Sequence, residues 1–343
     1  MNLKQLSEAL GLSQTTVSRA LNGYPEVSEK TREKVRKAAL AANYQPSKRA
    51  RSLATGRAMA IGHVIPVSTQ QELVNPVFGD FIAGAGEIYS AEGYDMILSL
   101  VKDSDEADFY RDLKIKGNVD GIIVHGPRMA DPRIALLKEL GLPFVVHGRA
   151  SDIDLPYDFI DVPNITAFDQ ATTHMIELGH RRIALINGVE DLDFACRRRK
   201  GYERALSRAG LRIDPALMHS SDMTEAYGYN AARDMLDTDN PPTGFAVASM
   251  ITALGVRRAI EERGLKTGRD VSIVTFDDDL SYMRNGTQEA PIFTAVQSSV
   301  RDAGRHAARM LLDRVANPNA PAAETMMDCG LIIGETTGPV PKN

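Results

Sequence analysis

Short apolar runs alternate with amphipathic stretches from residue 58 almost to the end of this 343-residue chain. The runs are AIGHVIP, DMILSLV, DGIIVHG, PFVVHG, RIALING, FAVAS and VSIVTF. Stretches with helical spacing lie between them, such as FGDFIAGAGEIYSAEG, TAFDQATTHMIELG and ITALGVRRAIEERG. Strand-length runs separated by helices predict βαβ units, in which helices cover a parallel sheet. The runs are too many for one modest sheet, so we expect an α/β body with two lobes.

Each lobe should be built from two separate segments of the chain. We expect a first lobe built from residues 58–160 and 292–321, and a second lobe from residues 161–291 and 322–343. In folds of this kind ligands gather at the carboxyl ends of the parallel strands. A ligand site is therefore expected between the lobes.

The segment before the body, residues 1–45, has a different pattern. Leu3, Leu6 and Leu10 recur at helical spacing, and Gly11 can adopt the left-handed backbone that ends a helix. Ser13 offers a cap to a second helix, from Gln14 to Leu21. Two short helices joined by a tight turn predict a helix-turn-helix head.

The outer face of that second helix carries polar side chains, namely Gln14, Thr15, Ser18 and Arg19. Such side chains suit the edges of base pairs in a major groove. The alternative is an ordinary helical hairpin. Ser28 can cap a third helix that extends to about Asn43.

Residues 46–57 form a basic connection, PSKRARSLATGR. They could make about two helical turns, which are marginal in isolation and leave Leu53 without a local partner. A segment of this kind can fold when DNA and a partner are both present. The alternative is a flexible linker.

Charge separates the head from the body. Residues 1–57 contain eleven Lys or Arg and four acidic residues, so their net charge is +7. The whole chain carries −5, which leaves −12 for residues 58–343. This asymmetry indicates that the head alone contacts phosphate.

Several protein classes are excluded by composition. No window approaches the roughly 18 apolar residues of a membrane span, and the N-terminus lacks a signal-peptide core. Two cysteines cannot form a disulfide framework, and no Cys/His cluster has metal-ligand spacing. The chain lacks GxSxG, Walker-type and HExxH motifs, so we expect no enzyme activity, no cofactor, no metal and no membrane contact, in a cytoplasmic protein.

The ordered motifs resemble the LacI/GalR family of transcription regulators. They are GLSQTTVSRALNG, ARSLATG, AIG with a later NP, DGIIV, GHRRIALING, the arginine run before Gly201-Tyr202, and VSIVTFDD. The resemblance extends over essentially the whole chain. It implies a periplasmic-binding-protein-like body, and a bound effector that controls the binding of the head to a palindromic operator.

The resemblance also implies roles for head and hinge residues. The residues expected to contact base edges are Gln14, Thr15 and Arg19. Those expected to contact the DNA backbone are Thr16, Asn22, Ser28 and Thr31. The hinge residues Ala50, Arg51 and Leu53 would lie in the minor groove, where Leu53 would wedge into a base step.

In the body, the resemblance implies that Arg198 clamps the effector and that Asp277 accepts hydrogen bonds from its hydroxyl groups. Further candidate contacts are His147, Arg149, His125, Phe78, Phe194 and Ser249. Ser249 and Met250 stand where the family usually has Asn-Asp, which indicates a different or larger ligand. The variants at these positions and at Thr275 and Phe276 are similar to an α-glucoside-responsive branch.

Two alternatives remain open from the sequence. The effector could be purine-like rather than a sugar, or the cleft could be degenerate and the regulator independent of ligand. A periplasmic sugar-binding protein shares the two-lobed body but would need an export signal in place of the basic head, so residues 1–57 exclude it. We expect a homodimer, because no leucine heptads follow Pro341 to form a tetramer.

Overall fold

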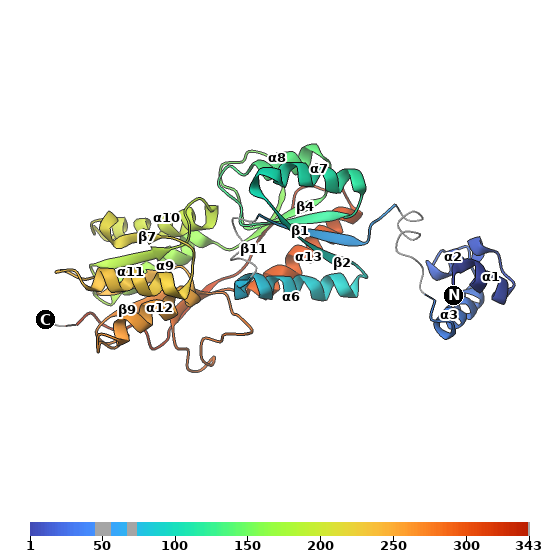
Figure 1. The fold of residues 1–343 in the computed structure, drawn as a ribbon. Coiled ribbons are helices and arrows are strands. Elements are labelled where there is room, and N and C mark those ends of the chain that lie inside the picture. Colours follow the sequence, from blue (N-terminus) through green and yellow to red (C-terminus); the bar gives the residue numbers. More distant parts are fainter. Residues whose placement is uncertain (45–55, 67–73, 342–343) are drawn as a thin grey trace.

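The structure, a computed structural model, describes residues 1–44, 56–66 and 74–341. It consists of a small helical head and a two-lobed α/β body (Figure 1). Along the described part of the chain, no helix has the length and apolar character needed to cross a membrane.

The head contains three helices: α1 (Leu3–Leu10), α2 (Gln14–Leu21) and α3 (Glu29–Ala41). Gly11 ends α1 with φ 65°, and the Ser13 hydroxyl caps α2 by accepting the Thr16 N–H. Ser28 caps α3 in the same way. These side chains confirm the predicted caps. The helices close on a core formed by Leu6, Val17, Ala20, Val27, Val35 and Ala39.

The first lobe is built on a sheet of six strands in the order β11-β5-β4-β3-β1-β2, and every neighbouring pair is parallel. The strands are β1 (Ala60–Pro66), β2 (Asp95–Val101), β3 (Gly121–His125), β4 (Phe144–His147), β5 (Asp158–Asp161) and β11 (Glu324–Met326). Helices α6 (Pro76–Ala91) and α13 (Val300–Ala316) cover one face, and α7 (Glu106–Lys116) and α8 (Pro132–Glu139) cover the other.

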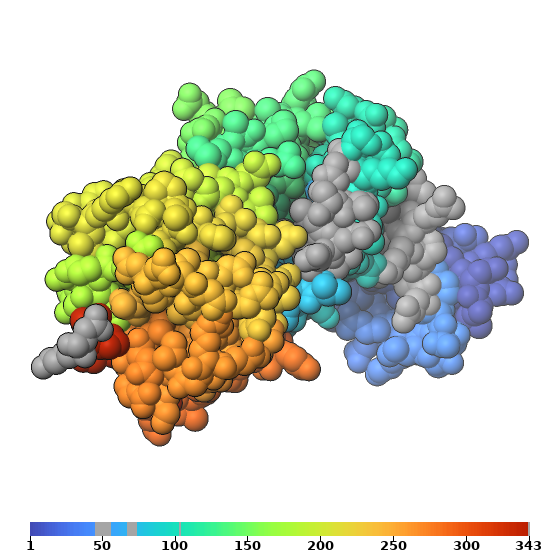
Figure 2. Space-filling view, turned by 60° about the vertical axis from the view of Figure 1, so that its left-hand side comes forward, coloured from blue at the N-terminus to red at the C-terminus, as the bar shows by residue number. Residues whose placement is uncertain are grey.

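The second lobe repeats this plan with the order β12-β10-β9-β8-β6-β7, in which only β12 is antiparallel to its neighbour. Its strands are β6 (Ile183–Asn187), β7 (Met218–Ser220), β8 (Gly244–Val247), β9 (Ser272–Asp277), β10 (Thr294–Gln297) and β12 (Gly330–Ile332). Helices α9 (Asn164–Glu177) and α10 (Asp193–Arg208) cover one face, and α11 (Glu225–Leu236) and α12 (Met250–Glu261) cover the other. The lobes pack against each other in the space-filling view (Figure 2).

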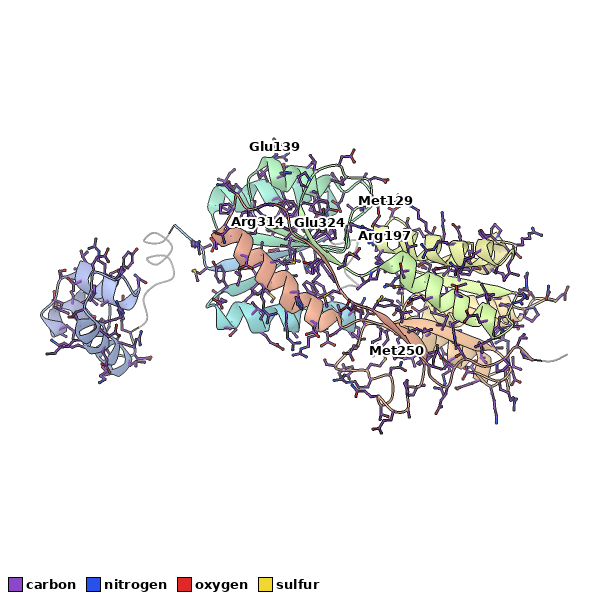
Figure 3. The ribbon with its side chains drawn as sticks, turned by 180° about the vertical axis from the view of Figure 1, so that it is seen from behind. Met129, Glu139, Arg197, Met250, Arg314 and Glu324 are labelled. Carbon is purple, nitrogen blue, oxygen red and sulfur yellow. The ribbon has the colours of Figure 1, made fainter. Side chains whose placement is uncertain are left out.

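The chain passes between the lobes after β5, after β10 and after β11. This corrects two of the expected lobe ranges. Residues 294–297 were expected in the first lobe but pair with β9 of the second, and residues 324–326 were expected in the second lobe but pair with β5 of the first. Figure 3 shows Glu324 in the first lobe. Strands of three or four residues carry too little periodicity to reveal which sheet they join.

Helices α9 and α10 approach closely because Gly201 lies between them. A Cβ atom at this position would stand 2.3 Å from the Ile165 carbonyl oxygen. We expect Gly201→Ala to reduce the free energy of unfolding by about 1–3 kcal/mol, because the helices must separate. The midpoint of urea unfolding measures this loss. The control is Gly79→Ala in α6, where the new methyl group meets open space and helix propensity favours alanine. An unchanged midpoint in Gly201→Ala would contradict the close packing.

Candidate functional site

The exposed face of α2 forms the candidate DNA-reading surface. Gln14, Thr15 and Arg19 are exposed there, while Val17 and Ala20 on the opposite side are buried in the head core. The structure therefore brings the three predicted base-reading residues onto one accessible face. Long polar side chains on a helix supported by two others can enter a groove without disturbing the head core.

The predicted backbone-contact residues lie around the starts and ends of the head helices. The hydroxyls of Ser13 and Thr16 are 2.8 Å apart, and those of Ser28 and Thr31 are 2.9 Å apart. Asn22 follows the last turn of α2. Hydroxyls and free backbone N–H groups at helix N-termini are suited to phosphate oxygens. The three hinge residues, Ala50, Arg51 and Leu53, lie outside the described residues.

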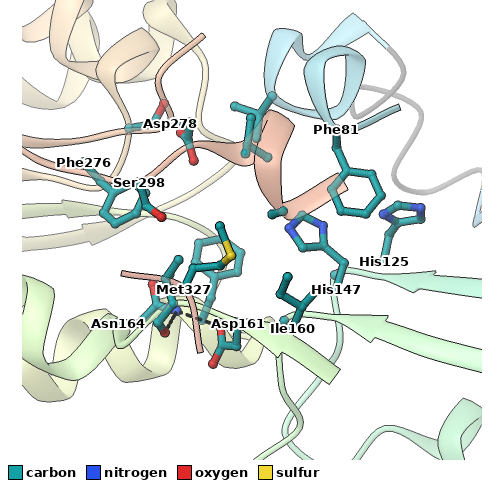
Figure 4. A pocket seen from close by; sticks show the side chains of 18 of the residues that line it. Phe81, His125, His147, Ile160, Asp161, Asn164, Phe276, Asp278, Ser298 and Met327 are labelled. Carbon is teal, nitrogen blue, oxygen red and sulfur yellow. Dashed lines mark hydrogen bonds between the residues drawn. The ribbon is translucent and has the colours of Figure 1, made fainter. Parts of the chain in front are cut away.

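A pocket of about 190 Å³ lies between the lobes of the body (Figure 4). Its first-lobe wall comes from the carboxyl ends of β3, β4 and β5 and from the start of α6, and its second-lobe wall from α10 and from the ends of β8 and β9. Seven of the eight predicted effector residues line it: Phe78, His125, His147, Arg149, Phe194, Arg198 and Ser249. Strand ends of both sheets therefore meet at one site, as the topology requires.

Arg198 is the central cation of the second-lobe wall. It is buried, it donates from Nε to the Asn164 side-chain oxygen at 2.8 Å and from Nη1 to the Ala248 carbonyl, and its guanidinium lies 4.1 Å from the centre of the Phe276 ring. Phe194 lies against the same guanidinium at 5.0 Å. Burial lowers the pKa of Arg198 to about 10, which still keeps it charged at neutral pH. Neutral acceptors and aromatic faces orient this charge without neutralising it.

The acid of the pocket is Asp278, and the prediction of Asp277 is wrong. Asp277 is buried behind the wall, where its carboxylate accepts the Asp279 N–H at 2.9 Å and the Gln297 side-chain amide at 2.9 Å. Asp278 lines the cavity (Figure 4). Successive side chains at the end of a strand point to opposite sides, so only one of two adjacent acids can face the ligand. Burial raises the pKa of Asp278 to about 7, against the opposing effect of Arg198.

Ser249 lines the pocket, but its hydroxyl already accepts the Ile251 N–H at 3.2 Å as the cap of α12. Met250 is buried in the core of the second lobe. The cavity is also smaller than the roughly 300–1,000 Å³ common for ligand pockets. In this arrangement of the lobes the replacement of Asn-Asp by Ser-Met does not enlarge the site.

Sequence reasoning missed a buried ionic link beside the pocket. Arg197 bonds the carboxylate of Asp161 at the end of β5 and that of Asp193 in its own helix at 2.6 Å (Figure 3 labels Arg197). All three side chains are almost fully buried. In the sequence, Asp161 and Asn164 lie at and just after a strand end, in DVPNITAF. That position at a carboxyl end was the signal that could have indicated a role for them at the site.

Two clasps, each made of hydrogen bonds between the lobes, flank the pocket. In the first, Asp80 of α6 accepts the backbone N–H of Ser281 at 2.7 Å and the Ser281 hydroxyl at 2.5 Å. In the second, Asp193 of α10 accepts the Ser151 N–H at 3.3 Å, and its own N–H bonds the Pro127 carbonyl at 3.0 Å. The clasps join the two lobes that form the pocket walls. A ligand that changes the distance between these walls would strengthen or break the clasps.

A helix-turn-helix head joined to a body with an interlobe pocket defines a DNA-binding transcription regulator. Residues 2–47 match the bacterial regulatory proteins of the lacI family, and residues 172–337 match a periplasmic binding protein-like domain. The chain belongs to the LacI family, whose members are transcription regulators and not enzymes.

The similarity extends over complete relatives. The HTH-type transcriptional regulator AglR of Rhizobium meliloti (strain 1021) is 43% identical over 99% of this chain and 95% of its own length. CelR of Thermobifida fusca is 29% identical over 97% of both chains. Among solved structures, the lac repressor dimer bound to operator and the anti-inducer ONPF superposes with a TM-score of 0.83 at 25% identity, over 98% of this chain and 99% of the other. A CelR–cellobiose complex gives a TM-score of 0.71 at 28% identity, over 98% and 99%.

The first clasp can be tested with two graded substitutions. Asp80→Ala leaves the part-buried Ser281 N–H without its acceptor and removes the ion pair with Arg301, and we expect it to lower the free energy of unfolding by about 1–3 kcal/mol. Ser281→Ala removes only the hydroxyl bond, so about 0.5–1.5 kcal/mol is expected. Hydrogen exchange at the Ser281 amide should accelerate in Asp80→Ala and remain slow in Ser281→Ala. Equal exchange in both variants would show that the clasp does not hold this segment.

The raised pKa of Asp278 predicts a pH dependence of stability. In the folded protein Asp278 keeps a proton up to about pH 7, whereas the unfolded chain releases it near the ordinary value of 3.8. The folded state therefore binds more protons across this window, and the contribution of Asp278 to stability falls as pH rises from about 4 to 7. We expect the stability of the unmodified protein relative to Asp278→Asn to decline over this range and then level off. Urea unfolding at stepped pH measures the difference.

The matched control is Asp279→Asn, which changes the adjacent carboxylate outside the pocket lining. Its difference from the unmodified protein should not reproduce the decline. A pH-independent difference for Asp278→Asn would contradict the raised pKa.

Proposed function

We propose that a small sugar bound in the interlobe pocket controls the binding of this regulator to its operator. The observation that carries the proposal is that Arg198 and Asp278 line one pocket together with aromatic rings from both lobes. Phe78 and Phe81 belong to the first lobe, and Phe194 and Phe276 to the second. A guanidinium donates to hydroxyl oxygens and a carboxylate accepts from hydroxyl groups, while aromatic faces cover the C–H surface of a sugar ring.

Cavity size and similarity to relatives support a class of sugar. A cavity of about 190 Å³ favours a ligand of one sugar ring or a slightly larger one. A relative of similar fold is solved as a cellobiose complex, so a body of this architecture accepts a glucoside. The α-glucoside class expected from the sequence fits these features. A planar purine-like effector remains the second candidate, because the same aromatic rings could stack on it.

At the other end of the molecule, we infer that Gln14, Thr15 and Arg19 read base edges and that Thr16, Asn22, Ser28 and Thr31 hold the DNA backbone. The exposure of the first three on α2 supports this assignment. We infer further that the hinge, with Ala50, Arg51 and Leu53, enters the minor groove. A palindromic operator would then match two copies of the head.

A homodimer fits the apolar side chains exposed on the body. Leu98 and Leu100 on the edge strand β2 are about half exposed, Leu254 on α12 is 38% exposed, and Tyr282 is 91% exposed. Strand β2, α6, α12 and the segment after β9 lie along the lower side of the body in Figure 1. The similar lac repressor structure is a dimer bound to operator. This side is therefore our proposed surface for the second copy.

The proposed switch depends on a difference in ligand affinity between two lobe arrangements. A ligand that binds both arrangements equally shifts nothing, however tightly it binds. Here the clasps at Asp80 and Asp193 favour one arrangement, and the ligand favours one by contacting Arg198 of the second lobe and His147 of the first lobe together. As a repressor of this kind, the protein would act in the cytoplasm, where its operator lies.

The test uses a reciprocal pair of variants in the full-length protein. An operator is first selected from random DNA, and its affinity is measured by gel shift with and without methyl α-D-glucopyranoside, maltose, D-glucose and adenine. We expect Arg198→Lys to keep operator affinity and lose the sugar response, because a planar donor fork is replaced by a point charge. We expect Arg19→Ala to weaken operator binding by about tenfold or more and to keep sugar binding.

Thermal shift measured with the same compounds reports binding without DNA. A response to adenine alone would replace the sugar by the purine-like candidate. No shift and no change in operator affinity with any compound would support a ligand-independent regulator instead.

A further inference from the structure

Three histidines lie side by side on the central strands of the first lobe. His63 belongs to β1, His125 to β3 and His147 to β4, and His125 and His147 are register partners. The Nδ1 atom of His63 and the Nε2 atom of His125 are 2.9 Å apart, and their rings stack at 5.2 Å. His125 and His147 line the pocket, whereas His63 is fully buried behind them (Figure 4 labels the two pocket histidines).

All three rings are neutral at physiological pH. Burial lowers the pKa of His63 to about 3, that of His125 well below its ordinary value, and that of His147 to about 4. A neutral imidazole carries one N–H donor and one bare nitrogen acceptor. The contact between His63 and His125 therefore holds only if one ring donates and the other accepts.

The surroundings of His63 decide which ring donates. Its Nε2 atom is buried and has no hydrogen-bond partner within residues 1–44, 56–66 and 74–341. A buried N–H without an acceptor is rarer in proteins than an under-satisfied acceptor, so the proton of His63 belongs on Nδ1. His63 then donates to Nε2 of His125, and the proton of His125 must lie on Nδ1.

Aromatic rings pack against His125. Phe78 and Phe81 each form a T-shaped pair with its ring, at 5.1 Å between ring centres. His147 is stacked on Phe81 at 4.2 Å. Because Nε2 of His125 is turned to His63, Nδ1 is the ring nitrogen left for a ligand in the pocket.

We propose that His63 is a positioning residue that fixes His125 as the Nδ1–H tautomer, and that His125 donates this N–H to an oxygen acceptor of the bound ligand. The second half rests on the proposed effector function of the pocket. As a consequence, the first-lobe wall of the pocket should select ligands by the hydrogen-bonding group that they present to His125. A sugar hydroxyl or ring oxygen is accepted there, while a ligand that presents only N–H donors leaves the buried donor of His125 unpaired.

The tautomer is measured directly, without a ligand. Long-range ¹H–¹⁵N correlation spectra of the full-length protein with ¹⁵N-labelled histidine distinguish Nδ1–H from Nε2–H rings, and His125→Asn identifies the signals of His125. We expect the Nδ1–H pattern. In His63→Leu the donor is lost, and a shift of His125 toward Nε2–H is expected. An Nε2–H pattern for His125 in the unmodified protein overturns the proposal.

Binding of methyl α-D-glucopyranoside, measured by calorimetry, tests the ligand contact. A lost hydrogen bond of about 1.4 kcal/mol raises Kd tenfold, so we expect at least about a tenfold increase in His125→Phe and in His63→Leu. His63→Asn places an amide N–H near the position of Nδ1, and its Kd should stay within about threefold of the unmodified value. Equal loss in His63→Leu and His63→Asn would mean that His63 only fills space, which overturns its positioning role.

The two proposals fail in different ways. If the unmodified protein does not bind the glucoside, D-glucose or maltose, the sugar assignment and the contact from His125 to a sugar are both wrong. The tautomer of His125 is still decided by the spectra. If the glucoside binds and His125→Phe binds it equally well, the sugar assignment stands and the donor role is wrong.

Discussion

A buried guanidinium joins the two lobes of the body. Arg197 is held between Asp161, at the end of a first-lobe strand, and Asp193, one turn away in its own helix. Charges removed from water are tolerated only when they are paired and hydrogen-bonded, and removal of one partner leaves the others uncompensated. The link therefore fixes the position of α10 against the first lobe, and with it the neighbouring Arg198 on the pocket wall.

Strand β1 lies between the proposed hinge segment and the interlobe pocket. Before β1 the backbone N–H groups of Ala58 and Met59 are both held by the Asp120 carboxylate, at 2.7 and 2.8 Å. Met59 has φ 54°, an uncommon conformation for a residue with a side chain. From this anchor β1 extends toward the pocket and carries His63. A movement of the first lobe would therefore carry Ala58 and Met59 with it, because the strand lies within a packed sheet.

The sequence patterns predicted local elements well and their assembly less well. Helix α2 begins and ends at the predicted residues, and all seven predicted strands exist, because caps and apolar runs act within a few residues. Strands such as β5 and β11 were not found, since their sequences, DFID and ETM, contain no apolar run that stands out from the surrounding chain. At the pocket, the sequence pointed to Asp277, whereas its neighbour Asp278 lines the cavity. The choice between Asp277 and Asp278 depends on strand twist and on the turn at Asp279, which no local pattern reports.

The energies of the interlobe contacts indicate what a small ligand can achieve. The clasps contribute four hydrogen bonds in total, each worth about 0.5–1.5 kcal/mol net. To move a two-state equilibrium from 1:99 to 99:1, a ligand needs a difference in affinity of about 5.5 kcal/mol. The two quantities are of the same order, so the proposed ligand contacts would compete with the clasps while the buried link between Arg197 and Asp161 stays in place. A body held by many more interlobe bonds could still bind such a ligand, but the ligand could not rearrange it.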